Sequence, residues 1–218
     1  MSGDPPATGP HQGQPVLAAG APLAEARAAL LMVHGRGASA ADILTYAGEL
    51  ARPGLAMLAP QAAGNAWYPA SFMAPLAANE PDLSSALALL DALVARIAAA
   101  GVPAARTVLL GFSQGACLAL EYAARHARRY GGLVGWSGGL IGPDDAPRDY
   151  AGSLDGTPVF LGCGNADPYI PTLRVTLSAS VLRRLGGDVT ARLYPGLGHT
   201  VNQDELDAAR AIVAAVAG

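Results

Sequence analysis

The sequence contains a serine set between two glycines in a pattern suited to nucleophilic chemistry. Residues 111–115 read GFSQG, with an apolar run before them and a helical pattern after them. Where a strand turns sharply into a helix, the flanking positions have no room for side chains, and Gly111 and Gly115 meet that need. Such a turn projects the Ser113 hydroxyl above the edge of a sheet. Because serine is a weak nucleophile by itself, this interpretation also requires a base.

The best candidate for that base is His199, which lies in the segment PGLGHT near the end of the chain. A nucleophile on a turn of this kind is followed along the chain first by the acid and then by the histidine of the triad. Of the four histidines, only His126 and His199 come after Ser113. His199 alone leaves room for an intervening strand and acid, so we expect its imidazole to take the serine proton.

Six aspartates between the nucleophile and the base are candidates for the acid. Asp167 follows the apolar run at 158–162, so it is expected at the carboxyl end of a strand. The next residue, Pro168, biases it toward an extended conformation. We predict that Asp167 orients the imidazole and stabilises its charged form. Asp144 and Asp145 remain the alternatives, although they follow a strand only after a longer excursion.

A glycine-rich loop, HGRGA at residues 34–38, follows the first buried apolar run. Acyl transfer needs two main-chain N–H donors aimed at the developing oxyanion. We expect one from Gln114, directly after the nucleophile, and one from Arg36, whose neighbouring glycines let the backbone turn inward. The sequence leaves open whether the Arg36 side chain points to solvent or contacts a substrate carboxylate.

The same loop also matches a dinucleotide-binding pattern, because GRGASA at residues 35–40 has the form G-x-G-x-x-A. That function requires an acidic residue at the end of the next strand. The next apolar run ends in MLAPQ and has no acid there. No phosphate-binding loop, CxxC pair or HExxH motif is present either, so the sequence predicts neither a cofactor nor a metal site.

Short apolar runs alternate with longer helical patterns along the chain. This alternation predicts an α/β fold with a mostly parallel central sheet and helices on both faces. Ser39 and Asp82 are expected as helix N-caps, and Gly101 and Gly186 as helix ends. We predict strands at 30–33, 55–59, 107–110, 133–136, 158–162 and 189–194, an antiparallel edge strand at 16–19, and helices at 40–51, 83–100, 114–129, 171–185 and 202–217. Ligands bind outside the carboxyl ends of the strands in such sheets, where the predicted triad also falls.

The composition excludes several classes of protein. The 218 residues are 51% apolar and 14% charged, with a net charge of −3, which is unlike a disordered chain or a nucleic-acid-binding domain. No uninterrupted apolar stretch reaches about 18 residues, so no membrane span is expected. We expect residues 1–13 to be a disordered leader rich in proline and glycine, and 14–218 to be one domain. Because the leader lacks signal-peptide features, and Cys117 and Cys163 are predicted to be buried free thiols, a cytoplasmic protein is expected.

An aromatic cluster stands out in a chain that is only 6% aromatic. Trp67, Tyr68 and Phe72 lie in a long loop at roughly 60–80, on the carboxyl side of a strand, and long loops are often functional. We predict that they and Met73 line the substrate pocket. The segment 138–156 is a second candidate for the rim, and it is too short to form a helical cap domain.

Several segments together resemble the phospholipase/carboxylesterase branch of the α/β-hydrolases, which includes acyl-protein thioesterases and small bacterial carboxylesterases. The segments are LMVHGRGA, APQAAGNAWYP, LLGFSQGACLAL, GNADPYIP and YPGLGH. The resemblance covers about residues 14–217. It implies an α/β-hydrolase fold, Ser113 as nucleophile, Asp167 as acid, His199 as base and an oxyanion hole from the main chains of Arg36 and Gln114. It also allows a homodimer.

The motifs and the resemblance together predict a serine carboxylesterase that hydrolyses small to medium esters through an acyl-enzyme. A lysophospholipase or an acyl-protein thioesterase with the same triad is the alternative within this chemistry. An alternative of another class is a non-catalytic binding protein on a hydrolase fold. The expected partner is a small-molecule ester.

Overall fold

A seven-stranded sheet forms the centre of the protein, in a computed structural model that describes residues 9–218. The strand order is β1-β3-β2-β4-β5-β6-β7, with β1 antiparallel to β3 and every other neighbouring pair parallel. The strands are β1 (Val16–Gly20), β2 (Ala28–Val33), β3 (Leu55–Pro60), β4 (Thr107–Phe112), β5 (Gly132–Trp136), β6 (Pro158–Gly164) and β7 (Asp188–Tyr194). This is the predicted α/β architecture, including its antiparallel edge strand.

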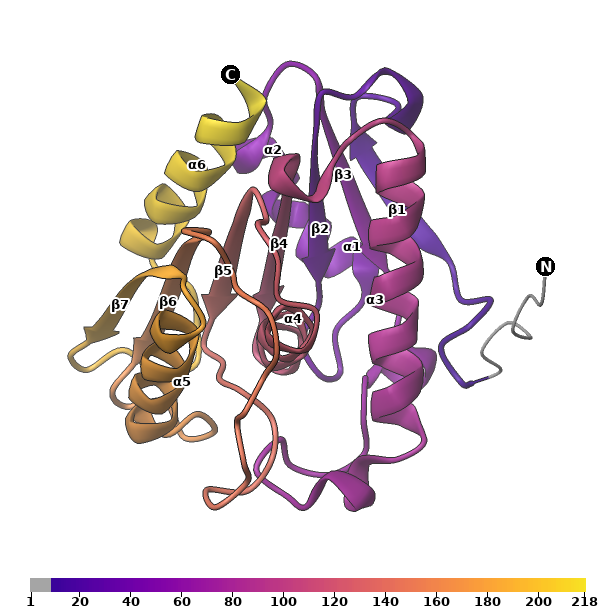
Figure 1. The fold of residues 1–218 in the computed structure, drawn as a ribbon. Coiled ribbons are helices and arrows are strands. Elements are labelled where there is room, and N and C mark those ends of the chain that lie inside the picture. The colour runs from indigo at the N-terminus through magenta and orange to yellow at the C-terminus, as the bar shows by residue number, and fades with distance from the viewer. Residues whose placement is uncertain (1–8) are drawn as a thin grey trace.

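Helices cover both faces of the sheet (Figure 1). The buried apolar side chains form two separate hydrophobic cores. The helices are α1 (Ala40–Ile43), α2 (Ala47–Leu50), α3 (Asp82–Ala99), α4 (Gln114–Arg125), α5 (Thr172–Arg184) and α6 (Gln203–Ala217). Every residue of β2 is buried, because successive side chains point alternately to the two faces and helices cover both of them. Leu31 and Val33 belong to the core that also contains residues of α3, α4 and α5, whereas Leu30 and Met32 belong to the core that contains residues of α1, α2 and α6.

The helix ends show where local sequence signals hold and where they do not. Ser39 caps α1 with a capping box, as predicted, and Gly101 and Gly186 follow α3 and α5 with φ of 96° and 86°. Asp82 is the first residue of α3 and not its N-cap, a position that Pro81 takes without a side-chain hydrogen bond.

Two predicted helices are shorter or less regular than expected. The predicted helix at 40–51 is divided by a 3₁₀ turn at Leu44–Tyr46, and four further short 3₁₀ segments occur at Leu23–Glu25, Ala63–Asn65, Leu76–Asn79 and Ala104–Arg106. The predicted helix at 114–129 ends at Arg125, because His126 leaves the helical region with φ −116° and ψ 46°.

The predicted disordered leader is wrong for residues 9–13, which are folded against the loop after β3; residues 1–8 lie outside the described part. His11 is fully buried. Its Nδ1 accepts from the N–H of Ala63 at 3.1 Å, and its Nε2 lies 3.0 Å from the carbonyl oxygen of Trp67. These two ring hydrogen bonds are the physical reason that residues 9–13 are folded, and amino-acid composition does not reveal them.

A buried glutamate lies in the first turn of α6. Glu205 and Asn202 form a capping box, in which each side chain accepts from the other's main-chain N–H at 2.9 Å. The indole N–H of Trp136 donates to the Glu205 carbonyl oxygen. The carboxyl group packs against β6 at Gly162, where Oε1 has no hydrogen-bond partner within residues 9–218. Burial raises the pKa of Glu205 to about 7.

This raised pKa predicts a pH-dependent stability that Glu205→Gln removes. Between the ordinary value and about 7 the folded chain holds a proton that the unfolded chain releases, so the free energy of unfolding falls as pH rises through this window. We expect Glu205→Gln to exceed the wild type by about 1–3 kcal/mol at pH 8, and by less than about 1 kcal/mol at pH 5, close to the ordinary value. Urea unfolding at both pH values measures this, with the exposed Glu25→Gln as a control that changes neither. A Glu205→Gln variant less stable than wild type at pH 8 contradicts the prediction.

Candidate active site

Ser113 occupies a strained turn between β4 and α4. Its φ of 56° and ψ of −122° are far from the usual regions for a side-chain-bearing residue. A Cβ at Gly111 would overlap the carbonyl group of Gly115, and a Cβ at Gly115 would overlap the carbonyl oxygen of Val33. The Ser113 N–H donates to the carbonyl oxygen of Trp136 at 2.9 Å. Only glycine at 111 and 115 lets strand and helix approach closely enough to hold the turn.

Three side chains from distant parts of the sequence form a continuous chain of hydrogen bonds at the carboxyl ends of the strands. Ser113 Oγ lies 2.8 Å from His199 Nε2, and His199 Nδ1 lies 2.7 Å from Asp167 Oδ2. Because the carboxylate accepts from Nδ1–H, Nε2 is left to accept the serine proton. The Asp167 side chain is fully buried and that of His199 is 18% exposed. The structure thus brings together the three residues that the sequence singled out.

Both oxygens of the Asp167 carboxylate accept hydrogen bonds, which fix its orientation. Oδ1 accepts from the N–H groups of Tyr169 at 2.8 Å and Ile170 at 3.1 Å, while Oδ2 faces His199. Burial by itself would raise the pKa of Asp167, but these hydrogen bonds bring it below its ordinary value. Asp167 is therefore suited to hold a charged imidazole. The alternative, Asp144, is exposed and pairs with Arg174 instead.

Two main-chain N–H groups beside Ser113 have no acceptor within residues 9–218. They belong to Gln114, at the start of α4, and to Arg36, in the loop after β2. This loop passes so close to the nucleophile that a Cβ at Gly35 would lie 3.3 Å from Ser113 Cβ. Gly37, with φ of 76°, donates its own N–H to the Asn65 carbonyl oxygen. Both N–H groups are therefore free to donate to an incoming acceptor, which is one requirement of an oxyanion hole.

Buried polar side chains fix the loop after β3 against this site. The Gln114 side chain accepts from the Trp67 N–H at 2.9 Å and donates to the Tyr68 carbonyl oxygen at 2.8 Å. The Trp67 indole donates to the His34 carbonyl oxygen at 2.8 Å. The His34 ring accepts from the Ala62 N–H through Nε2, so Nδ1 donates to the Gly35 carbonyl oxygen. Burial lowers the pKa of His34, which favours the neutral ring.

A cavity of about 490 Å³ opens beside Ser113. Tyr68 and Phe72 line it, as predicted, but Trp67 and Met73 do not. Trp67 is fully buried beneath the site, where its indole hydrogen bond holds it, and Met73 packs against the hydrophobic core. No residue of the predicted rim segment 138–156 lines the cavity. The lining residues are Arg36, Tyr68, Pro69, Ala70, Ser71, Phe72, Ser113, Gln114, Cys117, Tyr169, Ile170 and His199.

Two aromatic residues that the sequence motifs did not single out hold the histidine ring. Phe112 and Tyr169 flank His199, with ring centroids 4.9 Å and 5.0 Å from it. Tyr169 is 68% exposed and also lines the cavity. A usable signal was present, because Phe112 directly precedes the predicted nucleophile and Tyr169 lies two residues after the predicted acid.

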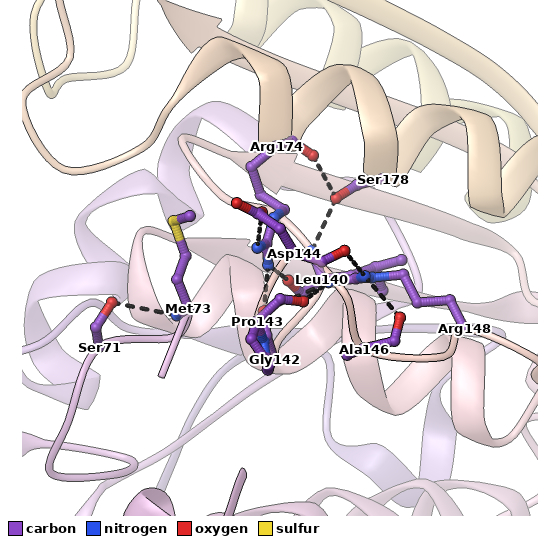
Figure 2. A network of polar contacts seen from close by, with 10 residues as sticks. All are labelled: Ser71, Met73, Leu140, Gly142, Pro143, Asp144, Ala146, Arg148, Arg174 and Ser178. Carbon is purple, nitrogen blue, oxygen red and sulfur yellow. Dashed lines mark hydrogen bonds and ion pairs between the residues drawn. The ribbon is translucent and has the colours of Figure 1, made fainter. Parts of the chain in front are cut away.

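A buried arginine, Arg174, is the centre of a polar network with the loop after β5 (Figure 2). Arg174 of α5 donates to the carbonyl oxygens of Leu140 at 2.8 Å and Gly142 at 2.6 Å, and it pairs with Asp144 at 2.6 Å. Its guanidinium lies 5.5 Å from the centre of the Phe72 ring. Gly142 in turn donates to the Phe72 carbonyl oxygen at 2.7 Å. The loop after β5 thus acts behind the cavity and not as its rim.

No group of three or more histidine, cysteine, aspartate or glutamate side chains in residues 9–218 is arranged to hold a metal ion. None of the helices there has the length and apolarity needed to cross a membrane. The cytoplasmic location and the homodimer stay predictions from the sequence.

The fold and this arrangement define an α/β-hydrolase-type protein. Residues 17–217 match the family model described as Phospholipase/Carboxylesterase, so the chain belongs to that family.

Two solved structures and one curated protein illustrate the relationship. The crystal structure of a phospholipase/carboxylesterase from Dyadobacter fermentans is 43% identical, with a TM-score of 0.89, over 95% of this chain and 99% of that one. The crystal structure of esterase PE8 is 27% identical, with a TM-score of 0.73, over 93% and 98%. Acyl-protein thioesterase 1 of Gibberella zeae is 36% identical over 122 residues, which are 52% of this chain and 49% of that protein. The chain therefore spans about half the length of this curated relative.

The close packing at the nucleophile turn predicts that Gly115→Ala is strongly destabilising. The new methyl group would overlap the carbonyl oxygens of Val33 and His34, which are backbone atoms that cannot move aside cheaply. We expect a loss of at least about 2 kcal/mol in the free energy of unfolding. Gly48→Ala in α2, where a Cβ meets nothing within 4 Å, is the matched control and should stabilise by about 0.5–1 kcal/mol. Equal stability of the two variants in urea titrations contradicts this account.

Proposed function

We propose that this chain is a serine carboxylesterase that hydrolyses small to medium carboxylic esters. The observation that carries the proposal is the hydrogen-bonded series from Ser113 through His199 to Asp167, beside the N–H groups of Arg36 and Gln114. Membership of the Phospholipase/Carboxylesterase family supports it. A neutral serine, a base and an oxyanion hole are together what ester cleavage requires.

The first half of the reaction forms an acyl-enzyme. Ser113 Oγ attacks the ester carbonyl carbon as His199 Nε2 takes its proton, and Asp167 stabilises the resulting imidazolium. The carbonyl oxygen becomes an oxyanion and accepts from the N–H groups of Arg36 and Gln114. When the tetrahedral species collapses, the carbon–oxygen bond to the alcohol breaks. His199 then returns its proton to the leaving alkoxide.

The second half repeats these steps with water. His199 removes a proton from a water molecule, whose oxygen attacks the acyl carbon. The oxyanion is held at the same two N–H groups until the bond to Ser113 breaks. His199 then reprotonates the serine oxygen, and the carboxylic acid leaves.

A thioester is the second candidate substrate, because curated relatives are named acyl-protein thioesterase 1. A lysophospholipid would use the same triad. A cavity of about 490 Å³, with Phe72 held in its wall by the Arg174 network, favours shorter acyl groups over long lipid chains. A non-catalytic binding function has less support, because all three triad residues are present and in contact.

The proposal predicts that Ser113→Ala abolishes nearly all esterase activity. Without the hydroxyl no acyl-enzyme forms, so kcat/KM for p-nitrophenyl acetate should fall by about 10³-fold or more. A fluorophosphonate reagent should label the wild type at Ser113, and mass spectrometry of the digested protein identifies the site. Ser84→Ala, on the exposed face of α3, is the control that keeps both activity and labelling. Near wild-type turnover by the Ser113→Ala variant would contradict the proposal.

The cavity predicts the dependence on acyl length. Among p-nitrophenyl esters, kcat/KM should be highest for acetate to octanoate and should fall for palmitate. Phe72→Ala removes a wall of the cavity, so it should shift the preference toward longer chains by about one log unit in the palmitate-to-butyrate ratio. A palmitoyl thioester measured in parallel tests the second candidate. If it exceeds every oxygen ester in kcat/KM, the thioesterase function is the correct one.

A further inference from the structure

Arg36 brings an unpaired positive charge to the cavity. Among the lining residues of the described chain it is the one with a fixed charge, since the others are neutral apart from the titratable His199. Its guanidinium makes no ion pair with a carboxylate of residues 9–218. Arg174 and Arg192, by contrast, pair with aspartates. The cavity therefore has a cationic group with no counter-ion from the described protein.

The guanidinium is also held in place before any ligand arrives. Nη1 donates to the Pro69 carbonyl oxygen at 2.9 Å, and Nη2 donates to the Ala70 carbonyl oxygen at 2.7 Å. Its central carbon lies 5.9 Å from the centre of the Tyr68 ring. These acceptors are neutral, so they fix the group without cancelling its charge. A fixed side chain loses less entropy when it binds a ligand.

Arg36 still has donors to offer. A guanidinium carries five N–H groups, and the two carbonyl contacts use two of them. The remaining donors include Nε–H and one N–H on each terminal nitrogen, which suit a planar carboxylate. Because Arg36 is exposed at the mouth of the cavity, an anion can reach it without a large desolvation cost.

We propose that Arg36 selects esters that carry a carboxylate away from the bond that is cleaved. The inference rests on the proposed esterase function and adds a substrate class to it. The Arg36 main-chain N–H faces the scissile carbonyl in that mechanism, while its side chain extends along the cavity wall to Pro69 and Ala70. A substrate bound at the nucleophile then places a second, anionic end within reach of the guanidinium.

Two matched ester pairs test the proposal on the acyl side and on the alcohol side. The first pair is monomethyl adipate and methyl adipamate; the second is 4-carboxyphenyl butanoate and 4-carbamoylphenyl butanoate. Each pair differs only in a carboxylate against a neutral amide of similar shape. The measured quantity is the ratio of kcat/KM for the acid to that for the amide. This ratio cancels any general loss of activity that follows from loosening the loop.

We expect Arg36→Gln to lower this ratio about three- to tenfold in at least one pair, as for loss of an exposed or half-exposed ion pair. Arg36→Lys should keep most of the preference, because it keeps the charge. Raising the salt concentration to 1 M should weaken the wild-type preference, since the screening length falls to about 3 Å. Arg148→Gln is the control: that arginine also donates to loop carbonyls, lies outside the cavity and should leave both ratios unchanged.

If Arg36→Gln leaves the acid-to-amide ratio of kcat/KM unchanged in both pairs, the inference is overturned. Arg36 then serves only to hold the loop through Pro69 and Ala70. A ratio that also falls in Arg148→Gln overturns the inference, because the effect would then be one of net charge. A failure of the proposed esterase function would give a different result from a failure of this inference. In that case the neutral amide esters are not hydrolysed, or Ser113→Ala hydrolyses them as fast as the wild type.

Discussion

The contact between backbone and backbone at the nucleophile turn is the constraint on which the site depends. β2, β4 and the start of α4 meet there so closely that neither Gly111 nor Gly115 has room for a methyl group. This approach forces Ser113 into its strained conformation and leaves the Gln114 N–H free at the end of a helix, where the dipole favours an anion. The positions of the base, the acid and the loop after β2 are useful only because this turn is held.

Polar side chains hold the wall of the cavity in place next to this turn. The Gln114 side chain holds the main chain of Trp67 and Tyr68, and the buried Asn79 side chain bonds the main chain of Ala70 and Ser71. A loop of this length, with only two short 3₁₀ segments, would otherwise be mobile. The Gln114 bonds are buried and the Asn79 bonds are partly buried. Breaking a buried one leaves an unsatisfied polar group and costs about 1–3 kcal/mol. The aromatic wall is therefore positioned by hydrogen bonds to its backbone as much as by packing.

The sequence predicts the parts of this structure that follow from chain order. Parallel strands bring their carboxyl ends to one edge, so residues after separate apolar runs, such as Asp167 and His199, are expected to meet. Which aromatic side chain faces the cavity is a different matter. Trp67 and Tyr68 are adjacent and similar in kind, and the choice depends on the His34 carbonyl that takes the indole N–H. The burial of His11 likewise rests on partners more than fifty residues away, beyond any local pattern.

Two arginines show how burial decides what a charge can do. Arg174 and Arg36 both hold a loop by donating to two main-chain carbonyl oxygens. The Arg174 side chain is 1% exposed, and a buried charge without a counter-ion is strongly unfavourable, so Asp144 pairs with it. Arg36 is exposed, and water stabilises its charge without an aspartate. The same loop-holding contact therefore leaves one arginine neutralised within the protein and the other available to an anionic group that enters the cavity.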